Sequence, residues 1–191
     1  LSGEVFVGMA MGMVGRMIFA TLQFGGSVID SELGLMAAQQ LNPLNGFNGG
    51  VFGQILFVAG LFYFWSLDYF SVLILALHES FSIVPLAASV HSLHSAEILA
   101  KLGAAIFAGG VMIATPIMAV MFFLTITIGL LSRAIQGLNI FAESFTMKIL
   151  VGISAVLLFL PLILLMVRDQ LERLIPSITD MLKHSLSVTT P

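Results

Sequence analysis

Long apolar stretches separated by short polar ones dominate the chain. They run from Val5 to about Phe24, from Val51 to Leu67, from Leu102 to Leu131 and from Ile149 to Val167. Because a helix needs about 20 apolar residues to cross a bilayer, these stretches predict helices of spanning length or close to it. None shows the alternation of apolar and polar residues that is typical of strands. The pattern predicts an all-α, polytopic membrane-type protein of long kinked helices and helical hairpins.

The polar interruptions predict where the helices end. Asp30 and Glu32 indicate a break after the first stretch, followed by the uncharged, amide-rich segment 37–50, AAQQLNPLNGFNGG. Asp68 interrupts the second stretch, which is either one long helix or a hairpin that turns near WSLDY. Two further polar segments, 78–97 and 132–148, are expected to be loops.

The third apolar stretch is longer than a bilayer requires. Its roughly 30 residues would extend about 45 Å as a helix, against about 30 Å of hydrocarbon. The helix must therefore tilt, kink or pack against protein, and Pro116 is a natural kink site because it lacks a backbone donor. The chain also has two candidate faces of small residues for close helix packing, namely Gly8, Gly12 and Gly15, and Ala100, Ala104 and Ala108. The alternative for the glycines is that glycine is simply frequent in membrane helices.

Two other segments are amphipathic. From Arg168 onward, apolar residues recur at helical spacing among charges, which fits a helix at a membrane surface or against a partner. An aromatic cluster is consistent equally with a belt at the membrane–water interface and with ordinary core packing; it consists of Phe62, Tyr63, Phe64, Trp65, Tyr69 and Phe70.

Composition excludes several classes of protein. Hydrophobic residues make up 59% of the 191 residues and charged residues 9%, whereas soluble domains carry about 25% charged residues. The net charge of −3 includes no basic stripe, so nucleic-acid binding is not indicated. The absence of cysteine excludes disulfides and thiol catalysis. We expect a single domain, 1–191, that lacks an N-terminal part because the chain begins inside an apolar region.

Candidate catalytic or metal-binding residues are sparse. His91, His94 and Glu97 follow one another at three-residue spacing, close to His78 and Glu79. This spacing converges on a metal less well than an i, i+4 pair, so a solvated loop is the favoured interpretation. Neither a serine-hydrolase motif nor a phosphate-binding loop is present, so we expect no enzyme activity and no cofactor.

Isolated charges in apolar surroundings are the remaining candidates for function. Arg16 and Asp68 are the two that lie deep in apolar stretches. Because an unpaired charge at a helix centre is costly, we expect Arg16 to pair with a partner subunit or to lie near an interface.

Four segments of the chain resemble a known family. EVFVGMAMGM, GLMAAQQLNP, GLLSRAIQGLNIF and FTMKILVG occur in the order seen in the FliR/SctT family of type III secretion export-gate proteins. The resemblance covers essentially the whole chain and is most specific between Gly129 and Phe141. In that motif region the residues of interest are Arg133, Gln136, Gly137, Asn139, Phe141 and Phe145.

The resemblance implies a subunit of a hetero-oligomeric protein-export gate in the bacterial inner membrane, at the flagellar basal body. It implies FliP-like and FliQ-like partners and an FlhB-like one, contact with lipid and passage of unfolded polypeptides. It further implies that Met36 to Gly53 plugs the channel, with Leu44 and Phe47 as apolar contacts beside Pro43, and with an amide lining of Gln39, Gln40, Asn42, Asn45 and Asn48. The alternative function is a small-solute transporter, although the internal repeats expected of one are not found.

The chain departs from the family pattern at several positions. Gln136-Gly137 replaces Pro-Gln, Asn42-Pro43 replaces Asp-Pro, and Ser144-Phe145-Thr146 stands where Gly-Phe-Pro is frequent. Asp30 and Glu32 make the chain more acidic than the family near that point. Functions that depend on those exact side chains are therefore not carried over.

Overall fold

A computed structural model describes the backbone of residues 2–36, 50–72, 74–75, 93–134 and 140–187. Side chains are described within these ranges except at 2–11, 13–15, 93–102, 134, 140–143 and 173–187. The described residues form helices and turns, without strands. The expected all-α class is confirmed.

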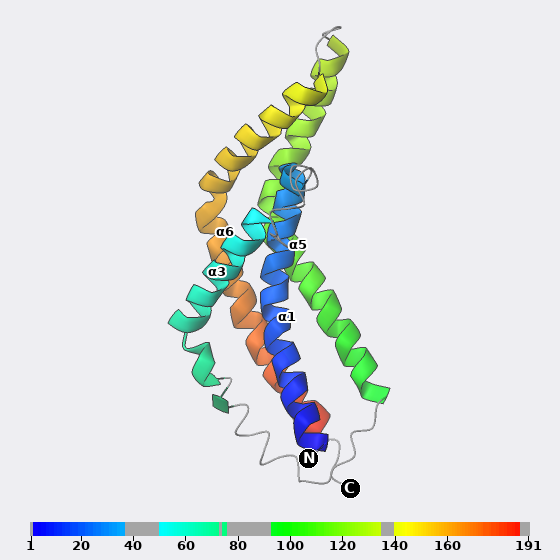
Figure 1. Ribbon diagram of the computed structural model, residues 1–191, viewed down its shortest axis with the longest axis vertical. Coiled ribbons are helices and arrows are strands. Elements are labelled where there is room, and N and C mark those ends of the chain that lie inside the picture. Colours follow the sequence, from blue (N-terminus) through cyan, green and yellow to red (C-terminus); the bar gives the residue numbers. More distant parts are fainter. Residues whose placement is uncertain (1, 37–49, 73, 76–92, 135–139, 188–191) are drawn as a thin grey trace, which may run out of the picture.

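Four helices make up the described chain: α1 (Ser2–Glu32), α3 (Val51–Ser66), α5 (Leu93–Ala134) and α6 (Ile140–Ser187). The central helix, α1, packs mainly along α5 and α3, and α6 packs mainly along α5. The molecule is elongated, and α5 and α6 form a long hairpin that reaches beyond the end of α1 (Figure 1). Midway along its length α5 changes direction (Figure 1), and Pro116 lies inside this helix.

The core lies where the four helices meet. In α1, Ile18, Leu22 and Ile29 are buried at intervals that place them on one helical face. They pack with Leu56 of α3 and with two further rows, namely Ile113, Ala114, Ile117 and Met121 of α5, and Ala155, Val156, Ile163, Val167 and Leu171 of α6. The last of these shows that the amphipathic segment after Arg168 begins inside the bundle, because α6 continues without a break to Ser187.

Several predicted breaks are wrong because the helices run further than the polar residues suggest. Asp30 and Glu32 belong to α1, so the break after the first stretch comes later than expected, at the turn of Leu33 and Gly34. The segment 132–148 is mostly helical, since α5 ends at Ala134 and α6 begins at Ile140. Segment 78–97 likewise gives its last residues to α5 from Leu93, and the rest of it lies outside the described residues.

Asp68 ends α3 in a tight turn. It has a positive φ of 54°, and its carboxylate accepts a 2.8 Å hydrogen bond from the Ser71 hydroxyl. Aspartate tolerates the left-handed region better than most residues. A continuous helix through WSLDY is therefore excluded, because α3 stops at Ser66 and helical structure resumes only at Tyr69.

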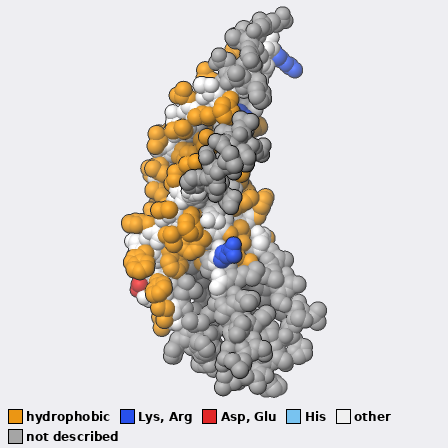
Figure 2. All heavy atoms as spheres, viewed as in Figure 1, with side chains coloured by type: hydrophobic (Ala, Val, Ile, Leu, Met, Phe, Trp, Pro, Cys, Tyr) orange, Lys and Arg blue, Asp and Glu red, His pale blue; other side chains and the backbone are white. Residues whose placement is uncertain are grey.

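Two helical segments, Gly103–Arg133 and Ser144–Glu172, are long and apolar enough to cross a membrane, judged by length and composition. In the chain alone, only 22% of the most apolar window of each segment is buried. Apolar side chains cover much of the described part of the face in Figure 2. The most exposed large ones include Val58, Phe62 and Trp65 of α3, Phe122, Phe123 and Leu130 of α5, and Leu150, Leu157, Leu158 and Leu165 of α6. This surface is compatible with lipid or with other subunits, and it is too apolar for water.

Candidate functional site at the junction of α1 and α3

The amide-rich segment singled out in the sequence connects the end of α1 to the start of α3. Residues 37–49 lie outside the described residues, so the candidate site is built from the two helix ends that flank them. On one side are Asp30, Leu33 and Gly34, and on the other are Gly50 and the first turn of α3. The geometry of these ends determines how the segment is attached to the bundle.

A buried carboxylate joins the two helices. Asp30 is fully buried, and its Oδ1 and Oδ2 accept hydrogen bonds from the backbone N–H of Phe52 at 3.2 and 3.1 Å. Its Oδ2 also accepts one from the N–H of Gly53 at 3.2 Å. The first N–H groups of a helix have no partner within the helix, and the N-cap residue of α3, Gly50, has no side chain to supply one. Asp30, which belongs to α1, accepts these hydrogen bonds instead. Its negative charge also suits the positive N-terminal end of the α3 dipole.

Burial of the Asp30 carboxylate disfavours its charged form, whereas the hydrogen bonds from α3 favour that form. Loss of water raises the pKa of Asp30 above its ordinary value, and the N–H donors of Phe52, Gly53 and Val51 counteract only part of that rise. The protonated form is thus favoured relative to an exposed aspartate. The fold is stabilised by protonation below the ordinary pKa of 3.8, and that contribution is lost as the pH rises through the raised value.

Glycines allow the two helices to approach this closely. A Cβ on Gly26 would collide with the backbone of Phe52 and Gly53, and a Cβ on Gly50 would collide with the Asp30 carboxylate. The neighbouring glycine, Gly25, allows α1 to approach α5, because a Cβ on Gly25 would lie 2.9 Å from the carbonyl oxygen of Gly110. Gly25 and Gly26 therefore place α1 against α5 and α3 at the same point along its length.

The other end of the segment is held by α6. After α1, Gly34 adopts a φ of +77° and its N–H donates to the carbonyl of Ser31 at 3.0 Å. Leu33 is fully buried against Gly152, where a Cβ would lie 2.6 Å from the leucine Cγ. The ring of Phe145 lies over Gly34, with its Cε2 3.2 Å from where a Cβ would be. Both ends of the amide-rich segment are thus fixed to the helical bundle.

The boundaries predicted for the plug need correction. It was expected to end at Gly53, but Val51 to Gly53 form the first turn of α3, because Asp30 satisfies their free N–H groups. Met36 lies in a short helical turn and is exposed. The other predicted plug residues lie outside the described residues; they are Gln39, Gln40, Asn42, Pro43, Leu44, Asn45, Phe47 and Asn48.

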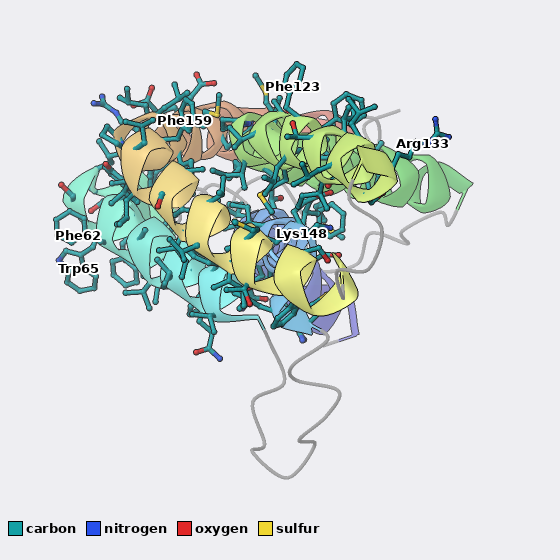
Figure 3. The ribbon with its side chains drawn as sticks, turned by 90° about the horizontal axis from the view of Figure 1, so that it is seen from above. Phe62, Trp65, Phe123, Arg133, Lys148 and Phe159 are labelled. Atoms are coloured by element: carbon teal, nitrogen blue, oxygen red, sulfur yellow. The ribbon has the colours of Figure 1, made fainter. Side chains whose placement is uncertain are left out.

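The motif residues that resemble the family are spread along the α5–α6 hairpin. Arg133 is exposed in the last turn of α5, and Figure 3 shows its side chain pointing away from the bundle. Phe145 contacts the end of α1, as described above. Phe141 belongs to α6 but its side chain is not described, and Gln136, Gly137 and Asn139 lie outside the described residues.

Among the described residues, the glycines that pack inside the chain lie outside the faces that the sequence indicates. Gly12 has no atom within 4 Å of an added Cβ, and Ala104 and Ala108 are exposed. The surroundings of Gly8, Gly15 and Ala100 are not described. Packing of these faces against another subunit stays a prediction. The missed signal was the paired glycines at 25–26 and 109–110, each of which gives a helix two adjacent positions for close approach.

The histidine pattern receives no test. His78, Glu79 and His91 lie outside the described residues, and the side chains of His94 and Glu97 are not described. Among the described residues no group of three potential metal ligands occurs.

The fold and the site together define a class of helical proteins. Its features are apolar helices of membrane-spanning length, an exposed apolar surface, and two helices, α1 and α3, that are joined by a buried carboxylate. Comparison with known families specifies the class further. The chain belongs to the bacterial export proteins, family 1, whose model matches residues 1–174.

Individual relatives carry a consistent name, flagellar biosynthetic protein FliR. The chain is 30% identical to the one from Pectobacterium carotovorum over 160 residues, which cover 84% of this chain and 61% of the relative. It is 29% identical to the Escherichia coli protein over the same shares of the two chains, and 24% identical to the Bacillus subtilis protein over 94% of this chain and 70% of the relative. The chain thus spans about three fifths of the length of the first two relatives.

Proposed function

We propose that the chain is a subunit of a type III protein-export gate, in which it forms part of the channel for unfolded polypeptides. The match of residues 1–174 to the export-protein family carries this proposal. The names of the relatives favour a flagellar rather than a virulence system. The gate lies in the bacterial inner membrane at the flagellar basal body, and FliP-like, FliQ-like and FlhB-like subunits surround this one.

Within the gate, the segment between α1 and α3 acts as the plug. Its residues 37–49 carry no charge and include five amide side chains. Amides can bond to one another when the channel is closed and to water when it is open. Asp30 holds the end of the segment at α3, and Leu33 and Gly34 hold its other end against α6. Fixed ends suit a plug, because movement is then confined to the segment between them.

Deletion of Leu44 to Gly49 tests the plug. Gly50 is kept because only glycine fits beside Asp30. We expect the gate to assemble, because the anchors stay intact. We expect it to leak ions or small molecules, because each lost amide bond removes about 0.5–1.5 kcal/mol of the free energy that closes the channel. Membrane conductance and uptake of small molecules measure the leak. Replacing the same residues with a Gly-Ser segment of equal length is the matched control for chain length. An assembled gate that stays tight in the deletion variant rules out the plug.

Produced without partners, the chain should not yield a well-folded monomer in detergent. Phe62, Trp65, Phe123 and Leu158 are each more than 60% exposed, and such a surface requires cover. Size-exclusion chromatography after expression alone and after co-expression with FliP-like and FliQ-like subunits measures the difference. A monodisperse monomer that is active alone would instead favour a small-solute transporter.

A further inference from the structure

The α5–α6 hairpin extends beyond the end of α1 as an arm of two helices (Figure 1). Among the side chains that the structure describes, Met121 is the last buried residue of α5 and Gly152 is the first of α6. From Met121 to its end at Ala134, α5 rises about 20 Å. We call residues 122–134 and 140–151 the hairpin arm. Because none of its described side chains is buried, the core holds the arm at its base.

Phe145 connects the hairpin arm to the end of α1. Its ring lies over Gly34, with Cε2 at 3.2 Å and Cδ2 at 3.4 Å from the place where a Cβ would be. About 10 Å further along α6, and on the same helix face, Gly152 receives the side chain of Leu33. Two consecutive residues of α1 are thus contacted by α6, Leu33 from the core and Gly34 from the arm.

Gly34 sets the direction in which the chain leaves α1. Its φ of +77° and the 3.0 Å hydrogen bond from its N–H to the Ser31 carbonyl oxygen end the helix in the manner of a glycine C-cap. Glycine has more backbone conformations available than any other residue. A ring on Gly34 removes some of them, because rotation of the neighbouring peptide planes would have to displace the ring.

Different parts of the molecule hold the two ends of the proposed plug, residues 37–49. At the α3 end, the N–H groups of Phe52 and Gly53 donate to Asp30, which belongs to α1. At the α1 end, the contacts to Leu33 and Gly34 come from α6. A shift of α6 relative to α1 therefore changes the surroundings of Gly34 directly and leaves the hydrogen bonds of Asp30 in place.

We propose that Phe145 is a positioning residue for the plug, which fixes the turn at Gly34 and so couples the plug to the hairpin arm. Displacement of the arm, by a neighbouring subunit or by a polypeptide in the channel, lifts the ring from Gly34 and releases the chain that follows. Lys148 is half-buried on the same face of α6, between Phe145 and Gly152, where a positive charge suits the C-terminal end of the α1 dipole. The inference rests on the plug in the proposed function and adds the residue that controls it.

Phe145→Ala removes the ring, and Phe123→Ala is its matched control. Phe123 also belongs to the hairpin arm, but it is 69% exposed and points away from the bundle in Figure 3. In the assembled gate, reconstituted into vesicles, we expect Phe145→Ala to raise the resting ion leak about fivefold, as for the loss of one aromatic contact. Phe123→Ala should leave the leak unchanged. Phe145→Tyr keeps the ring and should retain the low leak of the wild type.

Hydrogen exchange measures the coupling itself. Peptides that cover residues 33–36 are followed in the resting gate and in a gate arrested by an exported polypeptide fused to a domain that does not unfold. We expect arrest to accelerate exchange about fivefold in the wild type and in Phe123→Ala. In Phe145→Ala, exchange should be fast at rest and should not increase further. A merely structural role of Phe145 would raise exchange throughout α1 and leave the response to arrest in place.

Several outcomes overturn the coupling. They are equal leaks in Phe145→Ala and Phe123→Ala, no acceleration on arrest in the wild type, and an acceleration that persists in Phe145→Ala. Should the alanine variant not assemble, Phe145→Leu keeps the apolar volume without the flat ring, and a leak no higher than that of Phe145→Tyr then refutes the inference.

Deletion of Leu44 to Gly49 in the same vesicles separates this inference from the proposed function. If the deletion variant leaks while Phe145→Ala stays tight, the plug is retained and Phe145 does not position it. If the deletion variant stays tight, the plug is wrong and its positioning by Phe145 is wrong with it.

Discussion

Gly26→Leu should prevent the chain from accumulating in folded form. At this position α1 meets the backbone of α3, not a side chain, so the added atoms cannot be accommodated by a change of rotamer. Overpacking of a core by a few methylenes typically costs about 1–3 kcal/mol, and separation of two helices would cost more because it also breaks the hydrogen bonds to Asp30. Since total stabilities are about 5–15 kcal/mol, we expect a large loss. Immunoblots of membrane fractions and the thermal stability of the purified complex measure it.

The matched control for Gly26 is Gly129 on α5. Nothing lies within 4 Å of a Cβ added there. Replacing a helical glycine by alanine gains up to about 1 kcal/mol of helix propensity, so Gly129→Ala should be neutral or stabilising whereas Gly26→Ala should already be harmful. If both alanine variants behave like the wild type, the close contact of α1 with α3 is incorrect.

Asp30→Leu should release the start of α3 from α1. The N–H groups of Phe52 and Gly53 would lose their acceptor in a buried place. An unsatisfied buried donor costs about 1–3 kcal/mol, so the two together make this the second large effect. We expect a lower melting temperature and faster hydrogen exchange at residues 51–54. Unchanged exchange there would show that Asp30 does not hold the helix.

Asp30→Asn separates the hydrogen bonds from the charge. The amide oxygen still accepts from α3, and the cost of burying a charge disappears, so the loss should be smaller than in Asp30→Leu. Because burial raises the pKa of Asp30, lowering the pH from 7 toward 4 should stabilise the wild type relative to Asp30→Asn. Thermal denaturation of both proteins across that range measures the trend. Relative destabilisation of the wild type on acidification would contradict the raised pKa.

The sequence predicted the helical class and the apolar stretches, but it placed helix ends too early. Hydrophobic patterns treat a charge such as Asp30 as an end of the apolar segment, whereas here a partner helix satisfies that charge. The same limit applies to 132–148, where Arg133 of α5 and Thr146 of α6 occupy exposed helical positions. The local sequence does not reveal that a polar residue forms a hydrogen bond with another helix or is exposed on the surface, and either situation allows such a residue inside a helix.

For the candidate site, the sequence located the segment but not its anchors. The sequence presents Asp30 as a helix end and as a departure from the family pattern, because its partners are backbone N–H groups that no residue type reveals. The packing glycines were assigned to a regular spacing at Gly8, Gly12 and Gly15, while the observed contacts use adjacent pairs such as Gly25 and Gly26. An adjacent pair faces two different neighbours, and only the arrangement of three helices explains its use.

The bond between Asp30 and α3 also sets an order of events during synthesis. Phe52 follows Asp30 by 22 residues, so at about 5–20 residues per second its N–H leaves the ribosome about 1–4 s later. Until then the carboxylate has only water to solvate it, and burying it without a partner is costly. The C-terminal end of α1 therefore enters its final surroundings together with α3, as a pair. The contact of Leu33 with Gly152 can follow only after about 100 further residues have been made, so the α1–α3 hairpin is available as a template on which α5 and α6 assemble.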